Sequence, residues 1–184
     1  MATLFIKGLG ARAILAELLV LAVLGRAQAA APETIPEFTH TQAAEWLNSR
    51  PLTLKELQGK VVLVEFWAFD CVNCLRSAAW LRSVADQDAA AGLVVIGVHT
   101  PELPQERVSA NVRAAVQRLG INYPVMLDGD YSFWNAMNNR YWPAFYVVGP
   151  DGRVRAQAIG EMHVGESGAL QLESTIKTLL ATAR

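Results

Sequence analysis

Residues 71–74 read CVNC, and Cys71 and Cys74 are the only cysteines in a chain of 184 residues. Two thiols at this spacing can close a structural disulfide, bind a metal or exchange disulfides with another molecule. A disulfide across so short a loop constrains the unfolded chain very little, so a purely stabilising role is a poor explanation. Zinc needs about four ligands, whereas the sequence has no second CxxC pair and its three histidines lie far apart. We therefore expect thiol–disulfide exchange, with no metal and no other cofactor.

The segments on either side of the cysteines predict where the two thiols lie. Residues 61–67, VVLVEFW, form an almost continuous apolar run typical of buried strands, and residues 93–99, LVVIGVH, form a second. Between them, apolar residues at positions 75, 78, 81 and 85 recur at helical spacing. A strand, a helix and a second strand indicate a parallel crossover. The cysteines should then lie where a buried strand ends and a helix begins.

The start of a helix favours thiolate chemistry. Its first N–H groups have no partner within the helix and carry a partial positive charge, and both features stabilise a thiolate. At the first position of this helix, Cys71 would be the exposed sulfur that attacks a substrate. Cys74, one turn further along, would resolve the mixed disulfide formed at Cys71.

The rest of the chain predicts one α/β domain. Residues 108–119 have the periodicity of a helix, and a short strand near residues 123–127 and a short helix at residues 131–139 follow. Two further strands at residues 143–149 and 153–160 are joined by the turn sequence Pro-Asp-Gly, which indicates an antiparallel hairpin before a last helix. The net charge of −1, without a basic cluster, gives no sign of a nucleic-acid partner.

The beginning of the chain has the three-part pattern of a secretory signal. The basic residues Lys7 and Arg12 precede an apolar run that Glu17 interrupts, and small residues follow at Ala27 and Ala29. We expect a signal peptide at residues 1–29, with an uncleaved membrane anchor as the alternative.

Two boundaries follow from this pattern. Pro32 and Pro36 mark residues 30–40 as a linker, and residues 41–184 are then the folded domain. The signal pattern predicts a periplasmic or otherwise exported protein, and export would place Cys71 and Cys74 in an oxidising compartment where a disulfide between them persists.

Two segments carry a family resemblance. The sequence VVLVEFWAFDCVNC resembles the active-site strand and motif of thioredoxin-like proteins, and WPAFYVVGPDGRVR resembles their later loop and hairpin. The segment GVHTPE and the extra helix and strand before YWPA are similar to the exported TlpA-like and redoxin branch. This resemblance covers residues 36–183. It implies a thioredoxin fold, a central mixed sheet flanked by helices, with an inserted helix and strand, an N-terminal extension and disulfide oxidoreductase activity.

The resemblance also implies roles for five residues. Cys71 matches the attacking cysteine and Cys74 the resolving cysteine. Pro143 matches a proline that follows a cis peptide bond, and Trp142 before it is in the position whose backbone pairs with a bound substrate chain. Glu65 matches a buried acid near the resolving cysteine, where burial raises the carboxyl pKa and suits the group to accept a proton from Cys74.

Each of these assignments has an alternative. The indole of Trp142 can simply pack on the core, and the side chain of Glu65 can leave the strand at an edge. His99 ends the second buried strand and can lie near the cysteines, although a partly exposed histidine at the start of a loop is the simpler expectation. Asp70 precedes Cys71 directly and Arg76 lies one turn along the helix, so we expect a thiolate that is only moderately stabilised and a reducing or intermediate potential.

Three functions are compatible with these residues. The first is an exported oxidoreductase that exchanges electrons with protein thiols and disulfides, in the reducing direction, and takes electrons from a donor that the sequence does not identify. The second is a thiol-dependent peroxidase of the redoxin type. The third is a binding module without catalytic activity. We expect contact with a membrane only through an uncleaved N-terminal anchor.

Overall fold

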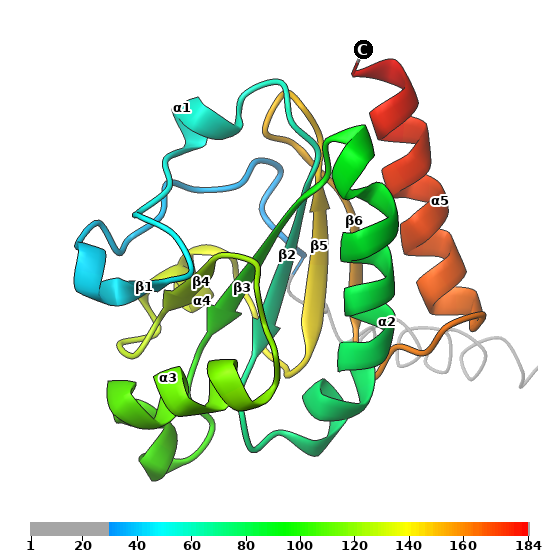
Figure 1. Ribbon diagram of the computed structural model, residues 1–184. Coiled ribbons are helices and arrows are strands. Elements are labelled where there is room, and N and C mark those ends of the chain that lie inside the picture. The colour runs from blue at the N-terminus through cyan, green and yellow to red at the C-terminus, as the bar shows by residue number, and fades with distance from the viewer. Residues whose placement is uncertain (1–29, 184) are drawn as a thin grey trace, which may run out of the picture. The chain divides into compact units, whose positions relative to one another are not determined.

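Six strands form one mixed sheet in the computed structural model, which describes residues 30–183 (Figure 1). The strands are β1 (Trp46–Leu47), β2 (Val62–Trp67), β3 (Val94–His99), β4 (Val125–Leu127), β5 (Ala144–Val148) and β6 (Val154–Ile159), in the spatial order β1-β4-β3-β2-β5-β6. The helices are α1 (Leu54–Leu57), α2 (Val72–Asp88), α3 (Ser109–Arg118), α4 (Ser132–Ala136) and α5 (Ser167–Thr182), and short 3-10 helices cover Ala43–Glu45, Ala89–Ala91 and Pro104–Arg107.

The predicted signal peptide or anchor, residues 1–29, lies outside the described residues. Across residues 30–183, no helix is both long enough and apolar enough to cross a membrane.

Strand β2 lies inside the sheet, and all six of its residues are buried. It runs parallel to β3 and antiparallel to β5, and β3 runs parallel to β4. Helix α2 connects β2 to β3, which confirms the predicted crossover. Strands β5 and β6 form the predicted antiparallel hairpin. The architecture is the expected mixed sheet flanked by helices, and α3 with β4 forms the inserted helix and strand.

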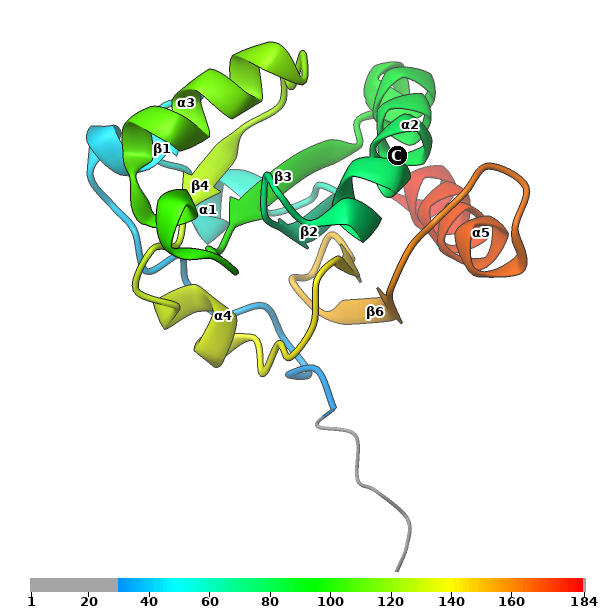
Figure 2. The same cartoon turned by 90° about the horizontal axis from the view of Figure 1, so that it is seen from below.

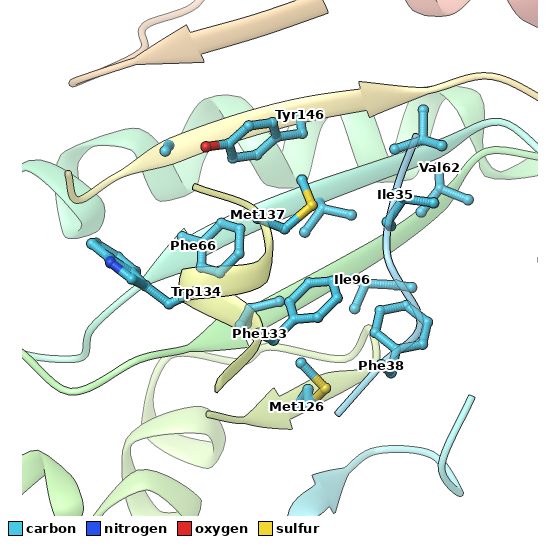
Figure 3. Packing of buried hydrophobic residues seen from close by; sticks show 14 of the residues in the cluster. Ile35, Phe38, Val62, Phe66, Ile96, Met126, Phe133, Trp134, Met137 and Tyr146 are labelled. Carbon is cyan, nitrogen blue, oxygen red and sulfur yellow. The ribbon is translucent and has the colours of Figure 1, made fainter. Parts of the chain in front are cut away.

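Different parts of the chain cover the two faces of the sheet (Figure 2). Successive residues of a strand point to opposite faces. Phe66 packs against α4, and its ring lies 5.9 Å from that of Phe133 and 5.6 Å from that of Trp134 (Figure 3). Leu63 and Trp67 pack on the opposite face, in the clusters built with α2, α3 and α5. Glu65 alternates with Phe66 and therefore points to the face that α2 covers.

The buried face of α2 differs from the predicted one. The apolar spacing placed Leu75 in the core, but its side chain is exposed, whereas Ser77 and Trp80 are buried. Both polar groups have partners: the Ser77 hydroxyl donates to the carbonyl of Asn73 and accepts the backbone N–H of Met162, and the Trp80 indole N–H donates to Glu173. A hydrogen-bonded polar group can be buried at little cost. Helix α2 therefore buries the face that carries Ser77 and Trp80, and not the face with Leu75 that hydrophobicity alone indicates.

The expected linker, residues 30–40, differs from the prediction over residues 31–40. Ile35 and Phe38 are buried in the core beside α4 (Figure 3). The backbone N–H of Ile35 donates to the carbonyl of Gly152, and Thr34 forms a β-bridge with Arg153 at the edge of the sheet. This segment packs against the fold because its two large apolar side chains cover the face of the sheet that α2 and α5 leave open.

Candidate active site

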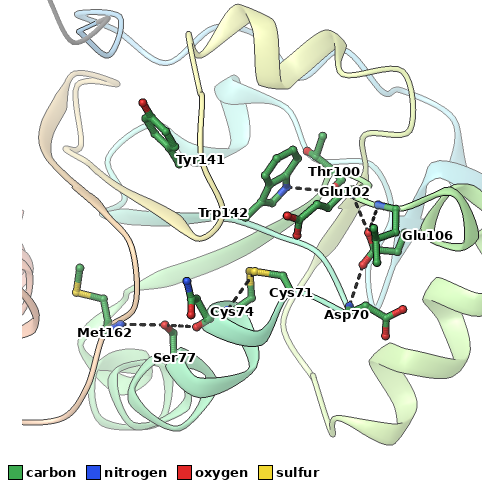
Figure 4. Close-up of a disulfide and its surroundings, with 12 residues drawn as sticks. Asp70, Cys71, Cys74, Ser77, Thr100, Glu102, Glu106, Tyr141, Trp142 and Met162 are labelled. Atoms are coloured by element: carbon green, nitrogen blue, oxygen red, sulfur yellow. Dashed lines mark hydrogen bonds between the residues drawn. A yellow bond between two sulfur atoms is a disulfide. The ribbon is translucent and has the colours of Figure 1, made fainter. Parts of the chain in front are cut away.

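The two cysteines lie at the junction of β2 and α2, as the sequence predicted (Figure 4). Cys71 is the N-cap of α2, and its sulfur accepts the backbone N–H of Cys74 at 3.3 Å. The two sulfurs are joined in a disulfide, with their Cα atoms 5.2 Å apart. The sulfur of Cys71 is thus in contact with the positive end of the helix, where a thiolate is stabilised.

Access to the disulfide differs between its two ends. Cys71 is 7% exposed and Cys74 is 3% exposed, whereas Val72 between them is 57% exposed. Both sulfurs are therefore largely covered in the disulfide form, with Cys71 the more accessible of the two. A partner must approach the turn at residues 71–73 to reach Cys71.

Glu65 is buried in the middle of β2, so its side chain does not leave the strand at an edge. Burial raises the pKa of its carboxyl from 4.5 to about 8, and a hydrogen bond from the hydroxyl of Tyr123 (3.3 Å) acts weakly in the opposite direction. Glu65 pairs with Gly97 of β3, where a Cβ would lie 3.1 Å from the Tyr123 ring. A residue without a side chain at this position leaves room for Tyr123 beside the carboxyl.

Glu65 and Cys74 line the same small cavity. It has a volume of about 30 Å³ and also contacts Trp67, Arg82 and Tyr123. Its walls come from β2, α2 and the loop before β4. The cavity therefore places a carboxyl of raised pKa and the inner sulfur of the disulfide around one space.

Trp142 and Pro143 lie between α4 and β5, and the peptide bond between them is cis, as the resemblance implied. The Trp142 indole N–H donates to the carbonyl of Thr100 at 2.9 Å, and its ring lies 4.2 Å from that of Trp134. The indole is half-buried and packs against the cluster that contains Cys71 and Cys74 (Figure 4). The structure thus brings Trp142 from a distant part of the chain to the disulfide.

Two charged neighbours of the cysteines, Asp70 and Arg76, have partners away from the sulfur of Cys71. The carboxylate of Asp70 accepts a hydrogen bond from Gln105 at 2.9 Å and points away from the sulfur of Cys71 (Figure 4). Arg76 faces Glu161, with 3.4 Å between their charged atoms. The expected carboxylate of Asp70 directly beside the sulfur is therefore wrong, and Arg76 is engaged away from Cys71.

His99 is buried rather than partly exposed. Its ring lies 5.0 Å from that of Trp67 and 5.7 Å from that of Phe69, and it is 2% exposed. Burial lowers the pKa of His99 from 6.5 to about 4, so the ring is neutral near pH 7. His99 stays buried although a loop begins at residue 100, because the rings of Trp67 and Phe69 cover it.

Sequence reasoning missed three residues that surround the cysteines. Tyr123 bonds to Glu65, Thr100 holds the indole of Trp142, and Glu106 accepts the backbone N–H of Asp70. Only Glu106 has a signal in the sequence. It is the third residue of the helix that begins at Pro104, and a glutamate at this position often bonds back to the helix N-terminus.

We predict that replacing Glu65 with Gln reduces the loss of stability that the folded chain suffers as pH rises from about 5 to about 8. Between pH 4.5 and about 8 the folded chain keeps a proton on Glu65 that the unfolded chain releases. The free energy of unfolding therefore falls as pH rises through this window, by at most about 1.4 kcal/mol per unit. Glutamine cannot ionise and removes this contribution.

Urea denaturation from about pH 5 to about pH 8 measures the effect, with Glu37→Gln as a control at an exposed glutamate. Parallel stability profiles for the parent chain and Glu65→Gln would show that the carboxyl is not protonated in the folded state.

Comparison with known proteins agrees with this geometry. The family model described as Redoxin matches residues 30–172. Protein DipZ of Mycobacterium tuberculosis is 46% identical over 123 residues, which are 63% of this chain, and this match spans only 17% of DipZ. Thiol-disulfide oxidoreductase YkuV of Bacillus subtilis is 29% identical over 152 residues, 81% of this chain and 95% of YkuV.

Solved structures share the fold. A thiol:disulfide interchange protein of the thioredoxin family from Chlorobium tepidum superimposes with a TM-score of 0.62 at 23% identity, over 82% of this chain and 98% of that one. Because the family model covers most of the sequence, including both cysteines, Glu65 and Pro143, the chain belongs to the redoxin family.

Proposed function

We propose that this chain is a thiol–disulfide oxidoreductase that acts on protein thiols and disulfides through Cys71 and Cys74. The observation that carries the proposal is the disulfide at the start of α2, with Cys74 and the buried carboxyl of Glu65 around one cavity. The name of the relative YkuV, which the chain matches over most of its length, supports the same activity.

The proposed reaction has two steps. The thiolate of Cys71 attacks one sulfur of a substrate disulfide, which forms a mixed disulfide and releases the other substrate sulfur as a thiolate that takes up a proton. The thiol of Cys74 then loses its proton and attacks the sulfur of Cys71. This step closes the disulfide seen in the structure and releases the reduced substrate. A donor dithiol reverses both steps and is itself oxidised.

Glu65 is the proposed proton acceptor and donor for Cys74. A pKa of about 8 lies close to the ordinary thiol value of about 8.5, so a proton can pass between the two groups in either direction at little cost. The cavity between them has room for one water molecule that can carry the proton. In the disulfide form Glu65 is mainly protonated near pH 7 and can supply a proton to the sulfur of Cys74 when a donor reduces the pair.

Trp142 and Pro143 are the proposed contact for the substrate chain. Trp142 packs beside the disulfide and its indole is fixed by Thr100, so the backbone that precedes Pro143 is held near the more accessible sulfur. An extended substrate segment can pair with this backbone. The large indole would restrict which segments approach Cys71.

We predict that the chain accelerates the reduction of insulin by dithiothreitol. Cys71→Ser should return the rate to that of dithiothreitol alone, because the attacking sulfur is lost and the remaining Cys74 is buried. Cys74→Ser should still attack insulin but should accumulate a mixed disulfide at Cys71, which mass spectrometry detects.

Consumption of hydrogen peroxide, measured in parallel, separates the alternatives. Rapid peroxide reduction that survives Cys74→Ser would favour a peroxidase. A chain that binds a partner but accelerates neither reaction would be a binding module.

We propose that the pair works in the reducing direction. The helix start stabilises the thiolate of Cys71, but Val72 and Asn73 within the motif carry no charge, and Arg76 is paired with Glu161. With an uncharged motif interior and with Arg76 paired elsewhere, the reduced form is only moderately favoured, which is the property of a reductant or of an isomerase-like catalyst.

We also propose that the protein is exported and that residues 1–29 are a cleaved signal. The support is their three-part sequence pattern. The first residue of the mature protein, isolated from the envelope of its native host and sequenced from the N-terminus, should be Ala30. If the protein is found in the membrane fraction with residues 1–29 still attached, the segment is an anchor. If it is found in the cytosol with residues 1–29 still attached, export is refuted.

A further inference from the structure

The loop between β3 and α3 contains a buried carboxylate close to the cysteines. Glu106 is 2% exposed. Its Oε1 accepts the backbone N–H of Asp70 at 2.8 Å, and its Oε2 accepts those of Glu102 and Leu103, each at 2.7 Å (Figure 4). Three short bonds to N–H donors suit a carboxylate, which only accepts hydrogen bonds.

The bond to Asp70 holds the turn that leads into α2. The backbone N–H of Cys71 donates to the carbonyl of Ala68 at 3.3 Å, which closes this turn. Asp70, within the turn, is tied to the helix Pro104–Arg107 twice, through its N–H to Glu106 and through its carboxylate to Gln105. The position of Cys71 therefore depends on a loop 36 residues further along the chain.

The same loop holds the other side of the site. The carbonyl of Thr100 accepts the indole N–H of Trp142. Residues 100–106 thus contact both the turn before Cys71 and the aromatic residue that packs beside the disulfide.

The charge of Glu106 is a second factor. Its three hydrogen-bond partners are all backbone N–H groups, so no cationic side chain is among them. A negative charge near a thiol opposes formation of the thiolate and raises the thiol pKa.

Other charged groups lie around the two cysteines. Asp70 points away from the sulfur and Arg76 is paired with Glu161, as described above. Glu102 is exposed in the same loop, and Glu65 and Arg82 line the cavity beside Cys74 on the inner side. Glu106 differs from these groups because it is both buried and bonded to the residue that precedes Cys71.

We propose that Glu106 is a positioning residue, which holds the Asp70–Cys71 turn in place and limits how strongly the thiolate of Cys71 is stabilised. The inference deepens the proposed function, because it concerns the reactivity of the attacking sulfur. A residue that only fastened the loop would affect the stability of the fold without changing the chemistry of the thiol.

The test is the pH dependence of alkylation of Cys71 by iodoacetamide in the reduced protein, followed by mass spectrometry. Glu106→Gln removes the charge, and because the amide has only one accepting oxygen it also gives up the backbone N–H bonds of the other carboxylate oxygen. We expect the thiol pKa of Cys71 to fall by about half a unit or more. The matched control is Glu173→Gln on α5, which makes the same change at a glutamate bonded to the Trp80 indole and should leave the pKa of Cys71 unchanged.

Glu106→Asp tests the positioning role separately and also serves if Glu106→Gln fails to fold. Aspartate keeps the charge but is one methylene too short to reach Asp70 and the two loop N–H groups together. We expect a nearly parental thiol pKa, with a limiting alkylation rate at high pH raised about twofold or more, because the turn no longer holds Cys71.

The proposal would be overturned if the folded variants kept both the thiol pKa of Cys71 and the limiting alkylation rate of the parent chain. Glu106 would then only stabilise the loop. Alkylation needs no substrate protein. Failure of this inference is therefore distinguishable from failure of the proposed function, which the insulin assay reports for the parent chain.

Discussion

The sulfur of Cys71 caps the N-terminus of α2, and the rest of the site is arranged around this contact. The bond from the N–H of Cys74 joins the two cysteines through the backbone as well as through the disulfide. This hydrogen bond requires α2 to begin directly after the turn that follows β2. If the helix began one residue earlier or later, the sulfur of Cys71 would no longer lie at the positive end of the helix. Burial of β2 on both faces fixes where that turn occurs, and the same burial raises the pKa of Glu65.

The site therefore combines two opposite electrostatic environments within a few residues. At the start of α2, unpaired N–H groups favour a negative charge on Cys71. Inside the sheet, burial among apolar side chains disfavours a negative charge on Glu65. Cys74 lies between them, with its N–H on the sulfur of Cys71 and its own sulfur at the cavity that Glu65 lines. This placement suits the outer sulfur to attack and the inner sulfur to exchange a proton.

The features that depend on neighbours in the sequence could be predicted, and those that depend on distant segments could not. The apolar run of β2, the CxxC spacing and the carboxyl at position 65 together indicate the strand, the helix start and the buried acid. The direction of Asp70, the burial of His99 and the role of Glu106 depend on packing between β2 and the loop after β3, which no local pattern specifies. Residues 30–40 looked like a linker because they contain Pro32 and Pro36 and show no apolar periodicity, yet the side chains of Ile35 and Phe38 enter the core.

The central claim is that the helix start stabilises the thiolate of Cys71 only moderately, because among residues 30–183 the two residues between the cysteines carry no charge and Arg76 is paired with Glu161. The reduction potential of the Cys71–Cys74 pair tests this claim most directly. Equilibration with dithiothreitol buffers of known potential, followed by trapping and counting of free thiols, gives the value. The account predicts a potential nearer to about −270 mV, the value of a reducing thioredoxin, than to about −120 mV, that of a strong oxidant. A potential close to −120 mV, within about 30 mV, would contradict the account and would show that the thiolate is stabilised strongly in spite of Glu106.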